Sequence, residues 1–90
     1  MKRLECPFDD RIAIQKEHTG QYILIMHHDV KVYKRFEMAE KFLCDHKQHF
    51  NNMLKSGKLD FNDTKTMNDN LDCVAWQLSA LNQLFVDGLR

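Results

Sequence analysis

The first third of the chain alternates between apolar and polar residues with a period of two. Apolar side chains stand at every second position over residues 11–15 and at Val30 and Val32, which is the pattern of strands with one covered face. Residues 22–26 between them are all apolar, as expected of a central strand covered at least partly on both faces. Gly20, which is free to take a positive φ, marks a turn before this strand. These segments predict an antiparallel three-stranded meander.

The ten residues that precede the first predicted strand show no such alternation. They contain the only proline of the chain, Pro7, and two adjacent acids, Asp9 and Asp10. Proline and paired acidic residues are typical of irregular segments. We therefore expect residues 1–10 to be an irregular lead-in.

From Phe36 onward the spacing of apolar residues changes to steps of three and four, which predicts helices. The first helix is expected to run from there to the residues before Gly57, a natural left-handed terminator. The second is expected from about Thr64 or Thr66, whose hydroxyls are candidate N-caps, to Asp87. The fold class is thus α+β: a three-stranded antiparallel β-meander followed by two α-helices packed mainly on one sheet face.

The second predicted helix is apolar on two sides. One stripe, expected to cover the sheet, consists of Met67, Leu71, Val74, Ala75, Leu78, Phe85 and Leu89. A second stripe on the opposite side consists of Cys73, Trp76, Ala80 and Leu84. Leaving a tryptophan or leucine in water forgoes about 2–3 kcal/mol of burial free energy, so this second stripe must also be covered.

Two explanations for the cover of the second stripe are open. The first helix of the same chain is one, because a small domain gains most by covering its own surface. The other is an interface with a second copy or another protein, in which Trp76 is the main contact and Cys73 and Ala80 allow close helix approach. We adopt the second: Cys73, Trp76, Ala80 and Leu84 are the predicted partner or self-association interface, and the chain is predicted to form a homodimer.

Composition limits the classes of protein that fit. Ninety residues with 13 basic and 13 acidic side chains are enough for one domain, residues 1–90, with no net charge. No apolar run approaches the ~20 residues that cross a bilayer, so no membrane role is expected, and the expected location is the cytoplasm. Three cysteines cannot all pair within one chain, which fits free thiols in a reducing compartment.

The candidate chemistry is sparse. Cys44, His46 and His49 form a Cys-x-His-x-x-His string, but on a continuous helix Cys44 projects about 160° away from His46, so the three cannot share one metal ion. No order or flanking residue selects a Cys–His nucleophilic pair, and the glycines stand alone, so no phosphate loop exists. The sequence predicts no metal site, no catalytic residue and no cofactor, and the chain is not expected to be an enzyme.

A nucleic-acid site is the alternative. If Val30 and Val32 face the helices, the opposite sheet face carries Arg11, Lys31, Tyr33 and Arg35, which combine cations with an aromatic ring suited to stacking on a base. Against this interpretation, residues 60–90 hold two basic and five acidic side chains, which repel phosphate. A solvated charged face is the more ordinary explanation.

The sequence therefore favours a non-catalytic protein-binding module that occupies a surface of a larger protein partner of unknown identity. Phe, Tyr, Met, Ile, Asn and Lys total 32 residues, against 12 for Gly, Ala, Arg and Pro, which is the usage that A/T-rich codons produce. A small regulator or inhibitor from a phage or mobile element fits this skew and the chain length. Single-stranded nucleic-acid binding remains the alternative function.

Overall fold

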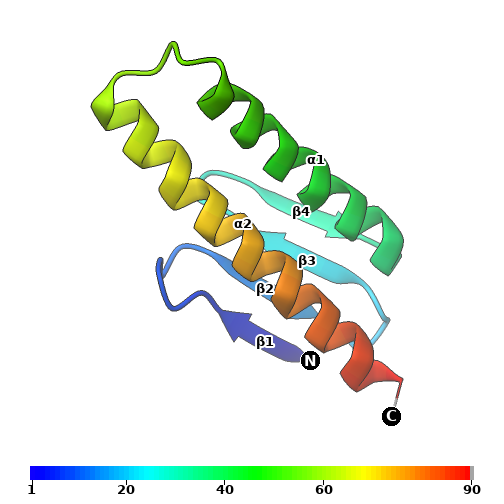
Figure 1. Ribbon diagram of the computed structural model, residues 1–90. Helices are drawn as coiled ribbons and strands as arrows, with labels where there is room; N and C mark the ends of the chain where they lie inside the picture. Colours follow the sequence, from blue (N-terminus) through cyan, green and yellow to red (C-terminus); the bar gives the residue numbers. More distant parts are fainter. Residues whose placement is uncertain (90) are drawn as a thin grey trace.

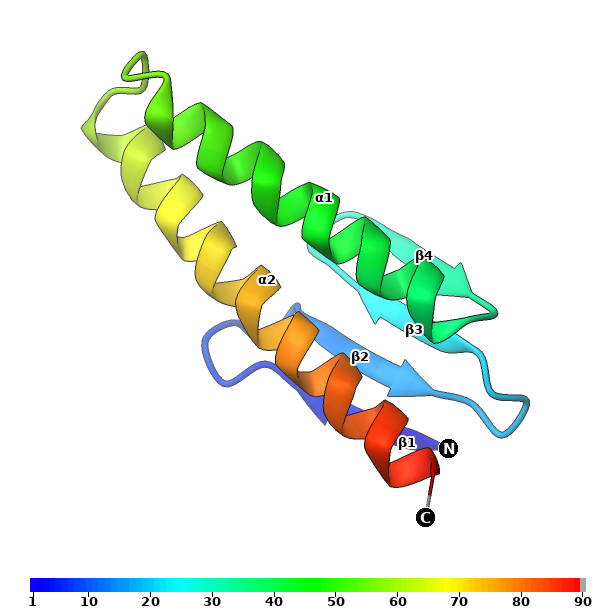
Figure 2. The ribbon, with the colours of Figure 1, turned by 45° about the vertical axis from the view of Figure 1, so that its right-hand side comes forward.

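Four β-strands precede two α-helices in the computed structural model, which describes residues 1–89 (Figure 1). The elements are β1 Lys2–Glu5, β2 Ala13–Lys16, β3 Tyr22–Ile25, β4 Val30–Tyr33, α1 Phe36–Lys55 and α2 Phe61–Gly88. The strands form one antiparallel sheet in the order β1-β2-β3-β4, and both helices lie on the same face of it (Figures 1 and 2). The protein is α+β as predicted, with one strand more than expected.

The additional strand, β1, lies in the segment predicted to be an irregular lead-in, so that prediction is wrong. β1 pairs with β2 so that Leu4 is opposite Ile14, and just beyond the strand the Cys6 N–H donates to the Ile12 carbonyl at 2.9 Å. Leu4 is the only apolar side chain of β1, and it packs against the core. An edge strand needs few covered side chains, so its composition resembles that of a loop.

The predicted turn before the central strand is confirmed. The Gly20 N–H donates to the Glu17 carbonyl at 2.9 Å, and the Glu17 N–H donates to the Gln21 carbonyl at 2.9 Å. Gly20 has a φ of 91°, a value that residues with a Cβ rarely adopt. A three-residue loop that ends on such a glycine is a common hairpin connection and fixes the pairing of β2 with β3.

The core lies between the sheet and the helix pair. Ile14 of β2 and Leu24 of β3 are opposite each other and fully buried, as are Leu43 of α1 and Leu81 and Leu84 of α2. α2 contacts β2, whereas α1 contacts β3 and β4 (Figure 2). The connection between the helices projects beyond the end of the sheet in both views.

The side-chain alternation of β4 is the reverse of the predicted one. Register pairs Leu24 with Lys31, and because paired residues share a face of the sheet, Lys31 and Tyr33 face the helices. Tyr33 indeed packs against the core. Val30 and Val32 lie on the opposite face, so the expectation that they face the helices is wrong.

The two faces of α2 are also interchanged relative to the prediction. Cys73, Ala80 and Leu84, three members of the second stripe, are buried in the hydrophobic core of their own chain. Gln77 lies among them, is 1% exposed, and donates from Nε2 to the main-chain carbonyls of Ala13 and Ile25 at 3.3 Å each. This is the face of α2 that packs on the sheet.

The stripe of α2 that was predicted to cover the sheet instead turns toward α1 or toward solvent. The ring of Phe85 stacks on Phe36 of α1 with centroids 4.3 Å apart. Ala75 is exposed, and Leu89 is 71% exposed. Val74 is the exception within this stripe, because it is buried in the core cluster that contains Ile14 and Leu24.

The connection between the helices confirms one predicted boundary and corrects another. Gly57 follows α1 with a φ of 69°, as expected of a left-handed terminator. α2 begins at Phe61, earlier than Thr64 or Thr66, because the Asp60 carboxylate accepts a hydrogen bond from the Asp63 N–H at 2.8 Å and caps the helix.

Candidate functional site

The outer face of the sheet, opposite the helices, carries four β-branched apolar side chains from its two last strands. We call them the outer apolar patch: Ile23, Ile25, Val30 and Val32. Register places Ile23 opposite Val32 and Ile25 opposite Val30, so the four are contiguous. Val30 is 57% exposed and Val32 is 55% exposed, and no helix or strand of residues 1–89 lies over this face (Figures 1 and 2).

The other half of the outer face is polar. On β1, the Arg3 guanidinium lies 3.3 Å from the Glu5 carboxylate. On the β2 side, the Gln15 amide donates to the Glu17 carboxylate at 2.6 Å. These groups satisfy one another, so the apolar surface is confined to β3 and β4.

The two strands expose this patch for different reasons. β3 is apolar on both faces, so while Leu24 and Tyr22 fill the core, Ile23 and Ile25 must lie outside. In β4, the long side chains of Lys31 and Tyr33 face the helices, which leaves the valines on the outer face. A sheet whose outer face were meant only for water would carry polar residues at these positions.

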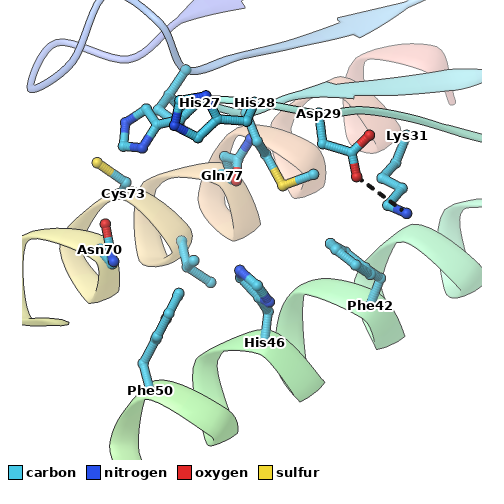
Figure 3. A pocket seen from close by; sticks show the side chains of 13 residues that line it. His27, His28, Asp29, Lys31, Phe42, His46, Phe50, Asn70, Cys73 and Gln77 are labelled. Carbon is cyan, nitrogen blue, oxygen red and sulfur yellow. Dashed lines mark ion pairs between the residues drawn. The ribbon is translucent and has the colours of Figure 1, made fainter.

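A second candidate site, which is concave, lies at the end of the sheet, between the helices and the turn that joins β3 to β4 (Figure 3). We call it the helix–turn cleft; its volume is about 380 Å³. Its walls are Ile12, Met26, His27, His28, Asp29, Lys31, Phe42, His46, Phe50, Asn70, Cys73, Val74 and Gln77. The cleft exists because α1 and α2 continue past the last strand residues.

His46 of α1 lies in an aromatic group that lines this cleft. Its ring stacks on Phe42 with centroids 5.4 Å apart and meets Phe50 edge-on at 4.5 Å. Burial among these rings, with a smaller contribution from the charge of His49, lowers the pKa of His46 below its usual value. The imidazole is therefore neutral near pH 7 and packs among the aromatic rings that α1 presents to the cleft.

Polar contacts tie the β1–β2 loop to the β3–β4 turn. Asp9 accepts hydrogen bonds from the main-chain N–H and the guanidinium of Arg11 at 3.0 and 3.1 Å, and it pairs with His27 Nε2. These contacts, with Arg11 as the largest cause, hold the pKa of Asp9 well below its usual range. The carboxylate stays ionised and fixes the turn that borders the cleft.

The cysteines occupy two different environments. Cys6 and Cys73 are buried together with Ile12, whereas Cys44 is exposed on α1. Burial, followed by the neighbouring Cys6, raises the pKa of Cys73 to about 11. At neutral pH Cys73 is a protonated thiol, which is a poor nucleophile.

Trp76 is the one member of the predicted interface that reaches the surface. It is half-buried, packs against the core, and lines a shallow groove with Leu4 and Pro7. Cys73, Ala80 and Leu84 lie beneath it, covered by the sheet of their own chain. A partner that docks on this side of α2 would therefore meet Trp76 without the other three.

The four residues predicted for the nucleic-acid alternative do not share one face. Arg11 is in the β1–β2 loop and pairs with Asp9. Lys31 and Tyr33 are on the helix-covered face, and Arg35 occupies the N-cap position of α1. The Tyr33 ring therefore packs against the core on the covered face together with Lys31, and Arg11 lies apart from both in the loop.

Sequence reasoning missed the outer apolar patch and the helix–turn cleft. The signal for the patch was present: a strand that is apolar on both faces requires a cover on both, and only two helices were predicted. The cleft gave no local signal, because its walls come from residues 12 to 77 and converge only in the folded chain.

No protein-family model matches the chain, and no curated protein or solved structure matches it. Within residues 1–89, no helix combines the length and the apolar character that crossing a membrane requires. In the same part of the chain, no three or more His, Cys, Asp or Glu side chains are grouped so that they could hold a metal ion.

Proposed function

We propose that this chain is a non-catalytic protein-binding module that docks onto an apolar surface of a larger protein through its outer apolar patch. One observation carries the proposal: two β-branched side chains, Val30 and Val32, are more than half exposed on a sheet face that nothing in residues 1–89 covers. Contiguous apolar surface of this kind, rimmed by polar groups, is typical of protein-interaction sites.

The patch is suited to rigid docking. Valine and isoleucine have restricted χ1 angles on a strand, so little side-chain entropy is lost when a partner covers them. Full burial of such a side chain is worth about 1.5–3 kcal/mol, and for the two valines roughly half of that remains to be gained. Ile23 and Ile25 extend the same surface toward the centre of the sheet.

A patch of four side chains is smaller than a standard interface of about 800 Å² per partner. The polar rim must contribute the remainder, and it includes Lys34 and Arg35 next to β4 and the Arg3–Glu5 pair on β1. Binding of this type needs no cofactor. We propose that the chain acts as a regulator or inhibitor by occupying the surface of its partner.

Site-specific photocrosslinking tests this function. The photoreactive residue p-benzoylphenylalanine replaces Ile23 in the patch and, in a matched control, Lys47 on the exposed side of α1. In cells that produce the protein naturally, irradiation of the Ile23 variant is expected to give a covalent product with a second, larger protein. The Lys47 variant is expected to give none.

Two results would contradict docking through the outer apolar patch. If both variants gave the same products, or if the Ile23 variant gave no product while remaining folded by circular dichroism, the patch would not be the docking surface. If only the Ile23 variant gives a product, purification of the larger protein and crosslinking in vitro establish whether binding is direct.

A further inference from the structure

The open edge of β4 offers unpaired main-chain groups. The Met26 N–H donates to the Asp29 carbonyl at 3.0 Å, which fixes the hydrogen-bonding alternation between β3 and β4. Lys31 and Tyr33 consequently bond to β3, whereas the main-chain groups of Val30 and Val32 point away from it. The Val30 N–H is satisfied by the Asp29 carboxylate at 2.9 Å, but no strand of residues 1–89 lies beyond Val32.

Antiparallel pairing of this edge with the same edge of a second copy is restricted in register. In such a pair, a residue whose N–H and C=O groups point away from β3 must lie opposite a residue of the same kind in the second copy. A two-fold axis through Lys31, Val32 or Tyr33 meets this condition. An axis at Lys31 places that lysine opposite its own copy, and an axis at Tyr33 places Lys31 opposite Arg35. Like charges directly opposite each other destabilise a strand pair.

The register centred on Val32 has no such conflict. It places Asp29 opposite Arg35 twice, once on each side of the axis, and places Lys31 opposite Tyr33. Arg35 has no ion-pair partner among residues 1–89. It follows the last residue of β4 by two positions, where the chain bends toward α1, and its own backbone is extended, with φ −129° and ψ 143°, so its long side chain starts just beyond the end of the strand. The Asp29 carboxylate lies 3.2 Å from Lys31 and is exposed, which leaves it accessible to a second cation.

We propose that the β4 edge is a self-association site, at which two copies of this chain pair antiparallel about Val32 to form one continuous sheet of eight strands. The Val32 N–H of each copy donates to the Val32 carbonyl of the other. Reciprocal ion pairs between Asp29 and Arg35 fix the register. The two outer apolar patches then meet at the axis and form a single surface twice as wide.

This inference goes beyond the proposed function, because the pairing of two copies needs no third protein. A chain that stayed monomeric would leave the crosslinking result at Ile23 unaffected. Conversely, a dimer without a docking partner would support only the pairing of β4. The two proposals therefore fail separately.

Charge exchange between two variants tests the register. Asp29→Arg alone and Arg35→Asp alone each place like charges opposite each other, and each is expected to weaken the dimer at least about tenfold. An equimolar mixture of the two variants restores opposite charges at both ends of the strand pair. Analytical ultracentrifugation at about 0.1 mM is expected to show dimer for the native chain and for the mixture, and monomer for each variant alone.

A matched control separates register from general attraction between charged proteins. Lys34→Asp changes the net charge as much as Arg35→Asp does, but position 34 lies opposite Val30 in this register. Lys34→Asp alone keeps both Asp29–Arg35 pairs and is expected to dimerise like the native chain. A mixed dimer with Asp29→Arg still places the introduced arginine at position 29 opposite Arg35 at one end, so mixing is expected to recruit no additional Asp29→Arg chain into dimer. Equal gain in both mixtures would overturn the register.

Removal of the central hydrogen bonds is the second test. Val32→Pro deletes an N–H that points away from β3, a position at which proline is tolerated in an edge strand. The variant is expected to keep its urea unfolding midpoint and lose the dimer, whereas Val32→Ile keeps both. A monomeric native chain at about 0.1 mM, or a dimer that survives in a folded Val32→Pro variant, would overturn the proposal.

Discussion

The two edges of the sheet differ at corresponding positions. On β1, the side chains on the outer face of the sheet are those of Arg3 and Glu5, which form an ion pair with each other. On β4, they are Val30 and Val32, both more than half exposed. Charged side chains on an edge strand discourage pairing with other chains, and exposed β-branched ones permit it.

Contacts with the helices reinforce this difference. β1 is held by the Lys2–Asp87 ion pair at 2.7 Å and is flanked by Trp76 of α2. β4 contacts α1 through Tyr33, whose ring lies 5.8 Å from that of Phe42, and these contacts are all on the inner face. The β1 edge is thus covered by an ion pair and by contacts with α2, while the β4 edge carries exposed apolar side chains.

Truncation in the shared core is expected to have the largest effect on both edges. Leu24→Ala removes a fully buried side chain between β2 and β4 and is expected to lower the free energy of unfolding by about 3 kcal/mol. Urea unfolding followed by circular dichroism measures this. The control Val30→Ala is expected to cost under about 1 kcal/mol because that side chain is mainly exposed. Equal losses would contradict a core centred on Leu24.

Truncation of the tryptophan is expected to weaken the β1 side selectively. Trp76→Ala is expected to lower the free energy of unfolding by about 2 kcal/mol, since the ring is partly exposed and leaves a smaller cavity than a fully buried one. Hydrogen exchange of the β1 amides should accelerate more than that of the β4 amides. Unchanged stability together with a loss of dimer would instead assign the ring to an intermolecular interface, as the sequence alone predicted.

Replacement of the charges on β1 by valine should reduce the difference between the two edges of the sheet. The double variant Arg3→Val with Glu5→Val is expected to change stability by under about 1 kcal/mol, because the pair is exposed. With two open edges the chain can associate at both ends, and such contacts do not close on themselves. Light scattering should show a mass that grows with concentration; an unchanged mass would show that charge does not protect β1.

Acid is expected to lower the free energy of unfolding through His46, which lies on α1, the helix that contacts β4. Because burial lowers its folded-state pKa below the ordinary value of 6.5, the unfolded chain binds the proton more readily. Stability attributable to this group is complete above pH 6.5 and decreases as pH falls below it. His46→Phe should remove that dependence, whereas His49→Gln, at an exposed position, should retain it. Urea unfolding at several pH values distinguishes them.

Thiol reactivity is expected to show the smallest effect, and it reports how well the β1 side of the molecule excludes solvent. Cys44 is exposed and should react with Ellman's reagent within minutes. Cys6, directly after β1, and Cys73, with a pKa of about 11, should react only when the chain opens. Fast reaction of all three cysteines in the native protein would mean that the β1 side is open as well.

Sequence periodicity predicted most of the fold correctly: three of the four strands, both helices and the positive φ of Gly20 and Gly57. β1 was missed because its single core contact, Leu4, shows no alternation among charged neighbours. The start of α2 was placed late because Asp60, a competent N-cap, stands outside the apolar period. The first error arises where a tertiary contact overrides local pattern, and the second where a local side-chain cap extends the helix beyond its apolar period.

The candidate site was less accessible to prediction, for two physical reasons. The sheet-facing side of α2 contains Gln77, whose polarity concealed that face, although its amide is satisfied by main-chain carbonyls. In β4, the alternation of side chains does not by itself determine which of them face the helices. A shift of one residue in strand register exchanges the two sets. The valines were therefore assigned to the core and the outer apolar patch was not foreseen.

The hydrogen bonds of Gln77 have a consequence for how the layers assemble. Its amide spans carbonyls on two neighbouring strands, so only one longitudinal position of α2 satisfies it. Displacement of the helix by a single turn would leave that amide unpaired in an apolar environment, at a cost of about 1–3 kcal/mol. One glutamine thus selects a unique alignment of helix on sheet, where hydrophobic contact alone would tolerate several.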